Sequence, residues 1–109
     1  MSKRKLADLE KKSIKALGAS PNVNSGATFG DADGRKIFKN PITDYKYRGM
    51  TLEVKSTTKK QFTLKLETLK KLEVQSLNDL AVLVIDFSGK RFIIIPENDF
   101  TSMIESLER

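Results

Sequence analysis

The sequence predicts an α/β protein in which helices flank one mixed β-sheet, in the order α-β-β-β-α-β-β-α. Leucines recur at helical spacing within residues 2–17 and again within residues 65–77. Residues 80–87 form a nearly continuous apolar run, a pattern typical of a strand buried on both faces. A chain of 109 residues with 39% hydrophobic residues suits one compact domain, so residues 1–109 are assigned to a single domain.

The first half of the chain predicts one helix and two strands. A helix covers residues 2–17, because Leu6, Leu9, Ile14 and Leu17 form one apolar stripe and Gly18 is a common stop signal. Residues 18–30 read as a loop rich in Gly, Ser, Asn and Pro, and residues 30–34 as a turn. Residues 35–39 are predicted as a short strand, and residues 50–56 as a longer one.

The second half predicts a short strand, two helices and a hairpin. A basic turn at residues 57–60 leads to a short strand at 61–63 and a helix at 65–77. The strands at 80–87 and 91–95 pair as a hairpin around Ser88-Gly89. The final helix starts near Pro96, a residue well tolerated in a first helical turn.

The composition restricts the chemistry. The chain has no cysteine and no histidine, which excludes disulfides, zinc fingers and Cys- or His-based nucleophiles. Any bound metal would need oxygen ligands, which favours magnesium, manganese or calcium. A net charge of +6 favours an anionic partner, with nucleic acid first. Without a signal-peptide pattern or a run of about 18 apolar residues, no membrane association is expected and the predicted location is cytoplasmic.

Glu53 and Lys55 are the first candidates for a functional site. In the predicted strand Met50-Thr51-Leu52-Glu53-Val54-Lys55-Ser56, alternation directs Leu52 and Val54 to one face and Glu53 and Lys55 to the other. A carboxylate beside an ammonium group can hold a divalent cation and attract a phosphate. The simpler interpretation is a surface ion pair, which contributes little to stability.

Three further acids lie upstream. Glu10 falls inside the apolar stripe of the first helix, where an acid is costly unless it is paired or binds a metal. Its simpler role is as a partner for a lysine at the edge of the stripe. Asp31 and Asp33 lie in the predicted Gly-Asp-Ala-Asp-Gly turn, where both are ordinary turn residues. This turn lacks the glutamate that an EF-hand calcium loop requires.

These residues resemble the motifs of the PD-(D/E)XK nuclease superfamily, and within it those of archaeal-type Holliday junction resolvases and related phage recombination nucleases. The resemblance covers most of the chain. It is carried by Glu10, Ser25-Gly26-Ala27, Gly30-Asp31, Glu53-Val54-Lys55-Ser56-Thr57 and the strand at residues 80–87. It implies a restriction-endonuclease-like sheet and a Mg²⁺-dependent, structure-selective DNA endonuclease, with Mn²⁺ as a substitute metal. If the chain is encoded by a phage, its place of action is the host cytoplasm.

The resemblance also implies roles for individual residues. Asp31 and Glu53 would ligate Mg²⁺, with the Val54 carbonyl as a further ligand. Lys55 would orient the attacking water or stabilise the transition state, and Glu10 would support a second metal or a metal-bound water. Ser25 would contact a phosphate near the scissile bond. Asp33 is the alternative to Asp31, and Asp44 a more remote one, since the segment before Glu53 is longer than in the compact resolvase hairpin.

The remaining predictions concern partners. Contacts with DNA phosphates are assigned to the basic and polar residues Lys3, Arg4, Lys5, Lys59, Lys60 and Gln61. For any single lysine, a solvated basic surface is the simpler interpretation. A junction resolvase makes two opposed cuts, so the resemblance implies a homodimer, with Phe92, Phe100 and Met103 as candidates for its surface. The alternatives are a nuclease acting on flaps, nicked or foreign DNA, and a non-catalytic nucleic-acid-binding module.

Overall fold

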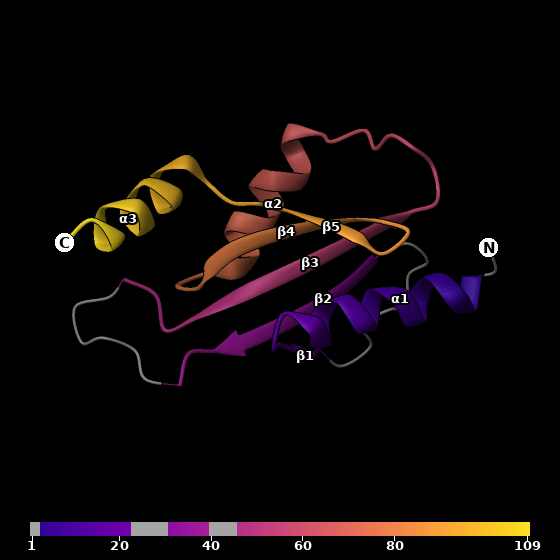
Figure 1. The fold of residues 1–109 in the computed structure, drawn as a ribbon, viewed down its shortest axis with the longest axis horizontal. Coiled ribbons are helices and arrows are strands. Elements are labelled where there is room, and N and C mark those ends of the chain that lie inside the picture. Colours follow the sequence, from indigo (N-terminus) through magenta and orange to yellow (C-terminus); the bar gives the residue numbers. More distant parts are fainter. Residues whose placement is uncertain (1–2, 23–30, 40–45) are drawn as a thin grey trace.

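The computed structural model describes residues 3–22, 31–39 and 46–109, with only the backbone described for residues 3–9 and 31. Three helices and five strands follow one another along the chain (Figure 1). Their bounds are α1 Lys3–Ala16, β1 Ser20–Pro21, β2 Asp31–Ile37, β3 Gly49–Thr57, α2 Leu66–Ser76, β4 Leu80–Phe87, β5 Lys90–Ile94 and α3 Glu97–Leu107.

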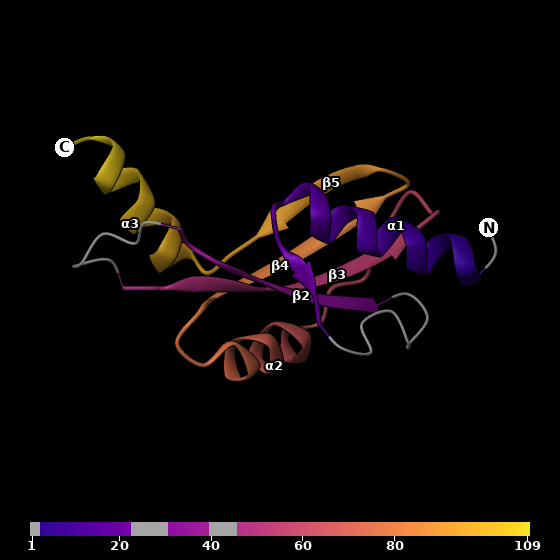
Figure 2. The same cartoon turned by 90° about the horizontal axis from the view of Figure 1, so that it is seen from below.

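The strands form one mixed sheet in the order β1-β2-β3-β4-β5. β3 and β4 run parallel because α2 connects them, and the other neighbouring pairs are antiparallel. Figure 2 shows α1 on one side of this sheet and α2 on the other. The arrangement is therefore α/β, as predicted, with three layers around β3 and β4.

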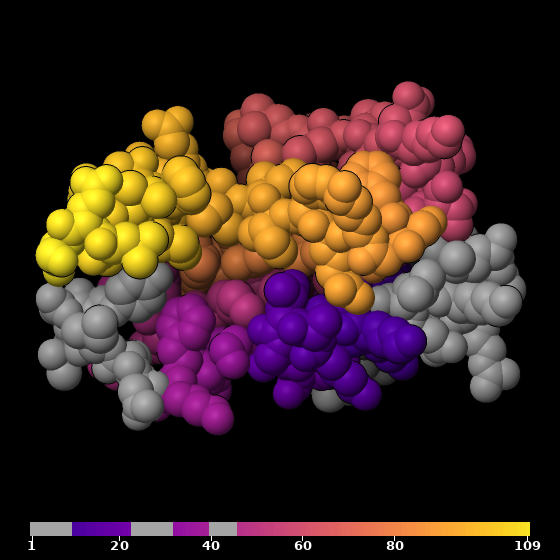
Figure 3. All heavy atoms as spheres, viewed as in Figure 1, coloured from indigo at the N-terminus to yellow at the C-terminus, as the bar shows by residue number. Residues whose placement is uncertain are grey.

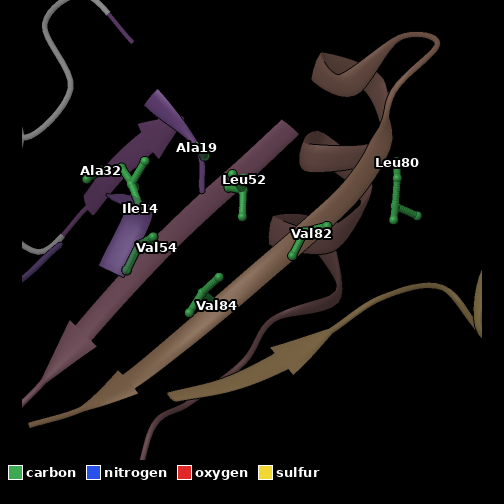
Figure 4. Packing of buried hydrophobic residues seen from close by; sticks show 8 residues of the cluster. All are labelled: Ile14, Ala19, Ala32, Leu52, Val54, Leu80, Val82 and Val84. Atoms are coloured by element: carbon green, nitrogen blue, oxygen red, sulfur yellow. The ribbon is translucent and has the colours of Figure 1, made fainter. Parts of the chain in front are cut away.

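Side-chain alternation gives the sheet two apolar faces. The face toward α1 contains Leu52, Val54, Val82 and Val84, which pack with Ile14 (Figure 4). The face toward α2 is built from Leu72, Ala81, Leu83 and Ile85. β4 contributes to both faces and is buried from Leu80 to Asp86, which confirms the prediction of a strand covered on both sides.

Close packing fixes α1 against β2. A Cβ atom added to Gly34 would lie 2.6 Å from Cγ2 of Ile14, so only glycine lets the helix approach this far. Ile14 is fully buried and Leu17 is packed against the same core. The predicted apolar stripe of the first helix thus faces the sheet where its side chains are described.

Two of the predictions about residues 31–34 and 61–63 were wrong. Residues 31–34 belong to β2 rather than to a turn, because pairing with β3 satisfies their backbone groups and Ala32 and Gly34 fit under α1. Residues 61–63 form no strand, and they are not part of the described five-stranded sheet. A short β1, which pairs with Gly34 and Arg35, was not predicted.

α3 lies at one end of the molecule (Figures 1 and 3), where Met103 packs against the core and Tyr47 donates a 2.6 Å hydrogen bond to Asp99. The molecule is elongated, measuring 46 × 26 × 23 Å along its principal axes. Among the described helices, none combines the length and the apolar character that crossing a membrane requires.

Candidate active site

Glu53 and Lys55 project from the middle of β3 onto the face that α2 partly covers. Their neighbours in β4 are Leu83 and Ile85, which belong to the core beneath α2. Lys55 Nζ lies 3.5 Å from Glu53 Oε1, and each side chain is less than one-fifth exposed. The predicted acid–base pair therefore exists as a mostly buried ion pair that keeps limited contact with solvent.

β2 brings both candidate aspartates to this pair. Asp33 is opposite Glu53 and Asp31 is opposite Lys55 in the antiparallel register. Residues opposite each other share a face, with Cβ atoms about 4.5–5.5 Å apart. As a strand, residues 31–34 thus keep Asp31 and Asp33 in register with Glu53 and Lys55.

The donor set suits a hard divalent cation. Mg²⁺ is usually bound by one or two carboxylates and keeps several waters, so Glu53 with one aspartate of β2 would suffice. Among the side chains that the structure describes, which do not include Asp31, no three acids gather into a metal-ligating group. Val54 is paired on both sides, with Ala32 and Val84, so its carbonyl lies within the sheet beside Glu53.

Glu10 reaches the sheet from the opposite side. It is fully buried and lies one helical turn before Ile14, on the same face of α1. The prediction that this acid faces the core is confirmed. Ile14 packs with Leu52 and Val54, whose side chains point away from Glu53 and Lys55. Glu10 therefore does not share the sheet face of the Glu53–Lys55 pair.

A polar network joins α1 to the β4–β5 hairpin near Glu10. Asp86, only 1% exposed, accepts a 2.6 Å hydrogen bond from Ser13 Oγ and a 2.5 Å bond from the Gly89 amide. Arg91 Nε donates to Ser13 Oγ at 2.7 Å and lies 3.7 Å from Asp86 Oδ2. The sequence analysis did not single out these residues, although an aspartate inside the apolar run 80–87 is a visible signal.

A second polar cluster borders the Asp33–Glu53 row on the same sheet face. Arg35 donates to both carboxylate oxygens of Asp79, at 2.6 and 3.1 Å, and Thr51 donates to Asp79 at 3.0 Å. The hydrogen bonds from Arg35 hold the pKa of Asp79 below its usual value against the opposing effect of burial. Arg35 therefore binds Asp79, and its strand partner is Thr51, two residues before Glu53 in β3.

The lowered pKa of Asp79 predicts an acid-sensitive contribution to stability. This contribution is complete above the unfolded-state pKa of about 3.9 and is lost as the pH falls through the lower folded-state pKa. The free energy of unfolding should therefore differ most between the wild type and Asp79→Asn above about pH 4, and the difference should shrink in more acidic solution. Urea unfolding at several pH values measures it, and a constant difference from pH 6 to pH 2.5 would contradict the assignment.

The predicted DNA contacts are spread over the chain. Lys3, Arg4 and Lys5 are on the first turn of α1, whereas Lys59, Lys60 and Gln61 are exposed just after β3. Ser25 and Asp44 lie outside the described residues. Figures 1 and 2 show the N-terminal half of α1 at the end of the sheet where β2 begins and β3 ends. The predicted DNA contacts within the described residues thus lie toward one end of the sheet.

The chain matches no protein-family model, and no curated protein or solved structure gives a significant match.

Proposed function

We propose that this protein is a metal-dependent endodeoxyribonuclease of the PD-(D/E)XK type, and most concretely a Holliday junction resolvase acting in DNA recombination or repair. One observation carries the proposal. The mostly buried Glu53–Lys55 pair lies opposite two aspartate positions of the neighbouring strand, Asp33 opposite Glu53 and Asp31 opposite Lys55. A surface ion pair needs no such acids beside it, whereas a phosphodiesterase site does.

Each residue of the proposed site has a separate role in hydrolysis. Mg²⁺, when bound, would neutralise phosphate charge and lower the pKa of a water molecule. Glu53 and Asp31, or Asp33 in its place, supply the oxygen ligands. Lys55 provides a fixed positive charge close to the scissile phosphate, where charge increases in the transition state. Without histidine in the chain, carboxylates and lysine are the available groups for orienting water.

The role of Glu10 in this proposal is indirect. As a fully buried acid in α1, it lies on the other side of β3 from Glu53. It would support a second metal or a metal-bound water only from the strand ends, near the start of β2. The primary site therefore consists of Asp31 or Asp33, Glu53 and Lys55.

The proposed substrate is branched DNA, and the proposed assembly is a homodimer. The net charge of +6 favours contact with phosphates at many positions. Each chain carries one Glu53–Lys55 site, so paired cuts in opposed strands of a junction require two chains. Exposed apolar residues on α3, among them Phe100 and Leu107, offer surface for such contacts.

A cleavage assay on a synthetic four-way junction tests the function. The protein should introduce symmetric cuts in Mg²⁺ or Mn²⁺ and none in EDTA. A linear duplex of the same sequence, a flap and a nicked duplex serve as matched substrates. Cutting all of them equally would favour a nuclease with a broader target, and tight binding without cleavage in either metal would indicate a non-catalytic binding module.

A further inference from the structure

An open groove of about 470 Å³ lies beside the candidate site, between the end of β3 and the β4–β5 hairpin. Its walls include three lysines and two aromatic rings, Lys59, Lys60, Lys90, Phe87 and Phe92, and we call it the aromatic–lysine groove. Among the described residues that line it, none is acidic. Figure 3 shows the hairpin at the surface next to the segment that follows β3.

The two rings are held in a fixed arrangement. Phe87 and Phe92 make a T-shaped contact with their centroids 6.1 Å apart and their planes at 79°. Lys90 Nζ lies 5.7 Å from the centre of the Phe92 ring. Phe92 is nevertheless 51% exposed. The groove thus presents aromatic surface to solvent and surrounds it with positive charge.

The sheet register places this groove on the same face as the candidate site. Asp31, Lys55, Ile85 and Phe92 form one continuous row across β2, β3, β4 and β5. Because neighbouring strands are about 4.8 Å apart, the Cα atoms of Lys55 and Phe92 are separated by roughly 10 Å. A single DNA strand with its phosphate at Lys55 can therefore reach the groove with an adjacent nucleotide.

We infer that the aromatic–lysine groove binds an unpaired nucleotide of the DNA substrate, next to the scissile phosphate. The base stacks on the exposed ring of Phe92, and the lysines contact the flanking phosphates. A duplex keeps its bases stacked on each other, so only single-stranded or branched DNA can use this contact. The inference deepens the proposed nuclease function, because it assigns selectivity for unpaired bases to a defined surface.

Binding measurements with the full chain in EDTA, where no hydrolysis occurs, test this inference. We expect Phe92→Ala to weaken binding of a single-stranded oligonucleotide by roughly tenfold and to leave binding of a blunt duplex nearly unchanged. Phe92→Tyr should restore single-strand binding, since it keeps an aromatic face. Val74→Ala is the matched control, because Val74 is an apolar residue 75% exposed on α2 that does not line the groove.

Three outcomes would overturn the inference. Phe92→Ala could bind the single strand as tightly as Val74→Ala does, or lose affinity for the single strand and the duplex equally. Sedimentation of Phe92→Ala could also reveal conversion of a dimer to a monomer, which would assign the groove to contact with a second copy. Mg²⁺-dependent cleavage by the wild type is measured separately. Cleavage without any selective effect of Phe92→Ala contradicts only this inference, and a selective effect of Phe92→Ala without cleavage contradicts only the nuclease proposal.

Discussion

Glu53→Gln is expected to lower the rate of Mg²⁺-dependent DNA cleavage by at least about a hundredfold while leaving the fold and DNA binding intact. Glutamine has nearly the same shape but carries no charge to hold a divalent cation. The variant also loses the 3.5 Å ion pair with Lys55, which is partly exposed and contributes at most about 1 kcal/mol to stability. Lys55→Ala should reduce cleavage by a similar factor, because the developing charge on the phosphate loses its nearest cation.

Single-turnover cleavage of a junction, measured with DNA affinity and thermal unfolding, separates catalysis from structure. Glu67→Gln is the matched control, because Glu67 is an exposed glutamate on α2 outside the candidate site. A large fall in the melting temperature of Glu53→Gln, together with full cleavage by the protein that remains folded, would assign Glu53 to a structural ion pair.

Asp86→Ala is expected to destabilise the fold by about 2–4 kcal/mol, the largest stability effect we predict. The carboxylate is 1% exposed and accepts bonds from Ser13 and the Gly89 amide. Its removal would leave these donors, and the nearby cation of Arg91, without their buried acceptor. The contact between α1 and the β4–β5 hairpin should weaken first, because Asp86 holds both elements.

Thermal and urea unfolding measure this effect, and a loss of this size should lower the melting temperature by at least about 10 °C. Asp86→Asn keeps one acceptor oxygen and the shape of the side chain, so it should lose less. Glu105→Ala, at an exposed position of α3, controls for the removal of a carboxylate. A change below about 0.5 kcal/mol in Asp86→Ala would show that the network does not hold α1.

At β2, tertiary packing overrides local propensity. Residues 31–34 contain two aspartates and a glycine, and local propensity predicts a turn. In the folded chain, pairing with β3 and the close approach of Ile14 to Gly34 stabilise a strand instead. Residue spacing does not choose between Asp31 and Asp33 as the metal ligand. The strand register does not choose either, because it places both beside the Glu53–Lys55 pair.

Local pattern determined the elements whose apolar periodicity is strong. α1, α2, β3, β4 and the hairpin turn at Ser88-Gly89 follow from residue spacing, as does the shared face of Glu53 and Lys55. Burial of Glu10 also followed, since its position in the stripe is a property of one helix. These features depend on residues within the same helix or strand. There, the spacing of apolar residues directly indicates which side chains face the core.

Only the tertiary structure decided how distant segments meet. The register of β2 against β3, the Ser13–Asp86–Arg91 network and the row that connects Lys55 with Phe92 all join residues far apart in the sequence. The physical reason is that sheet order and strand register depend on packing of the whole core. The sequence by itself supplied an acid–base pair on a strand, and the fold supplied its acidic neighbours, its separation from Glu10 and the groove beside it.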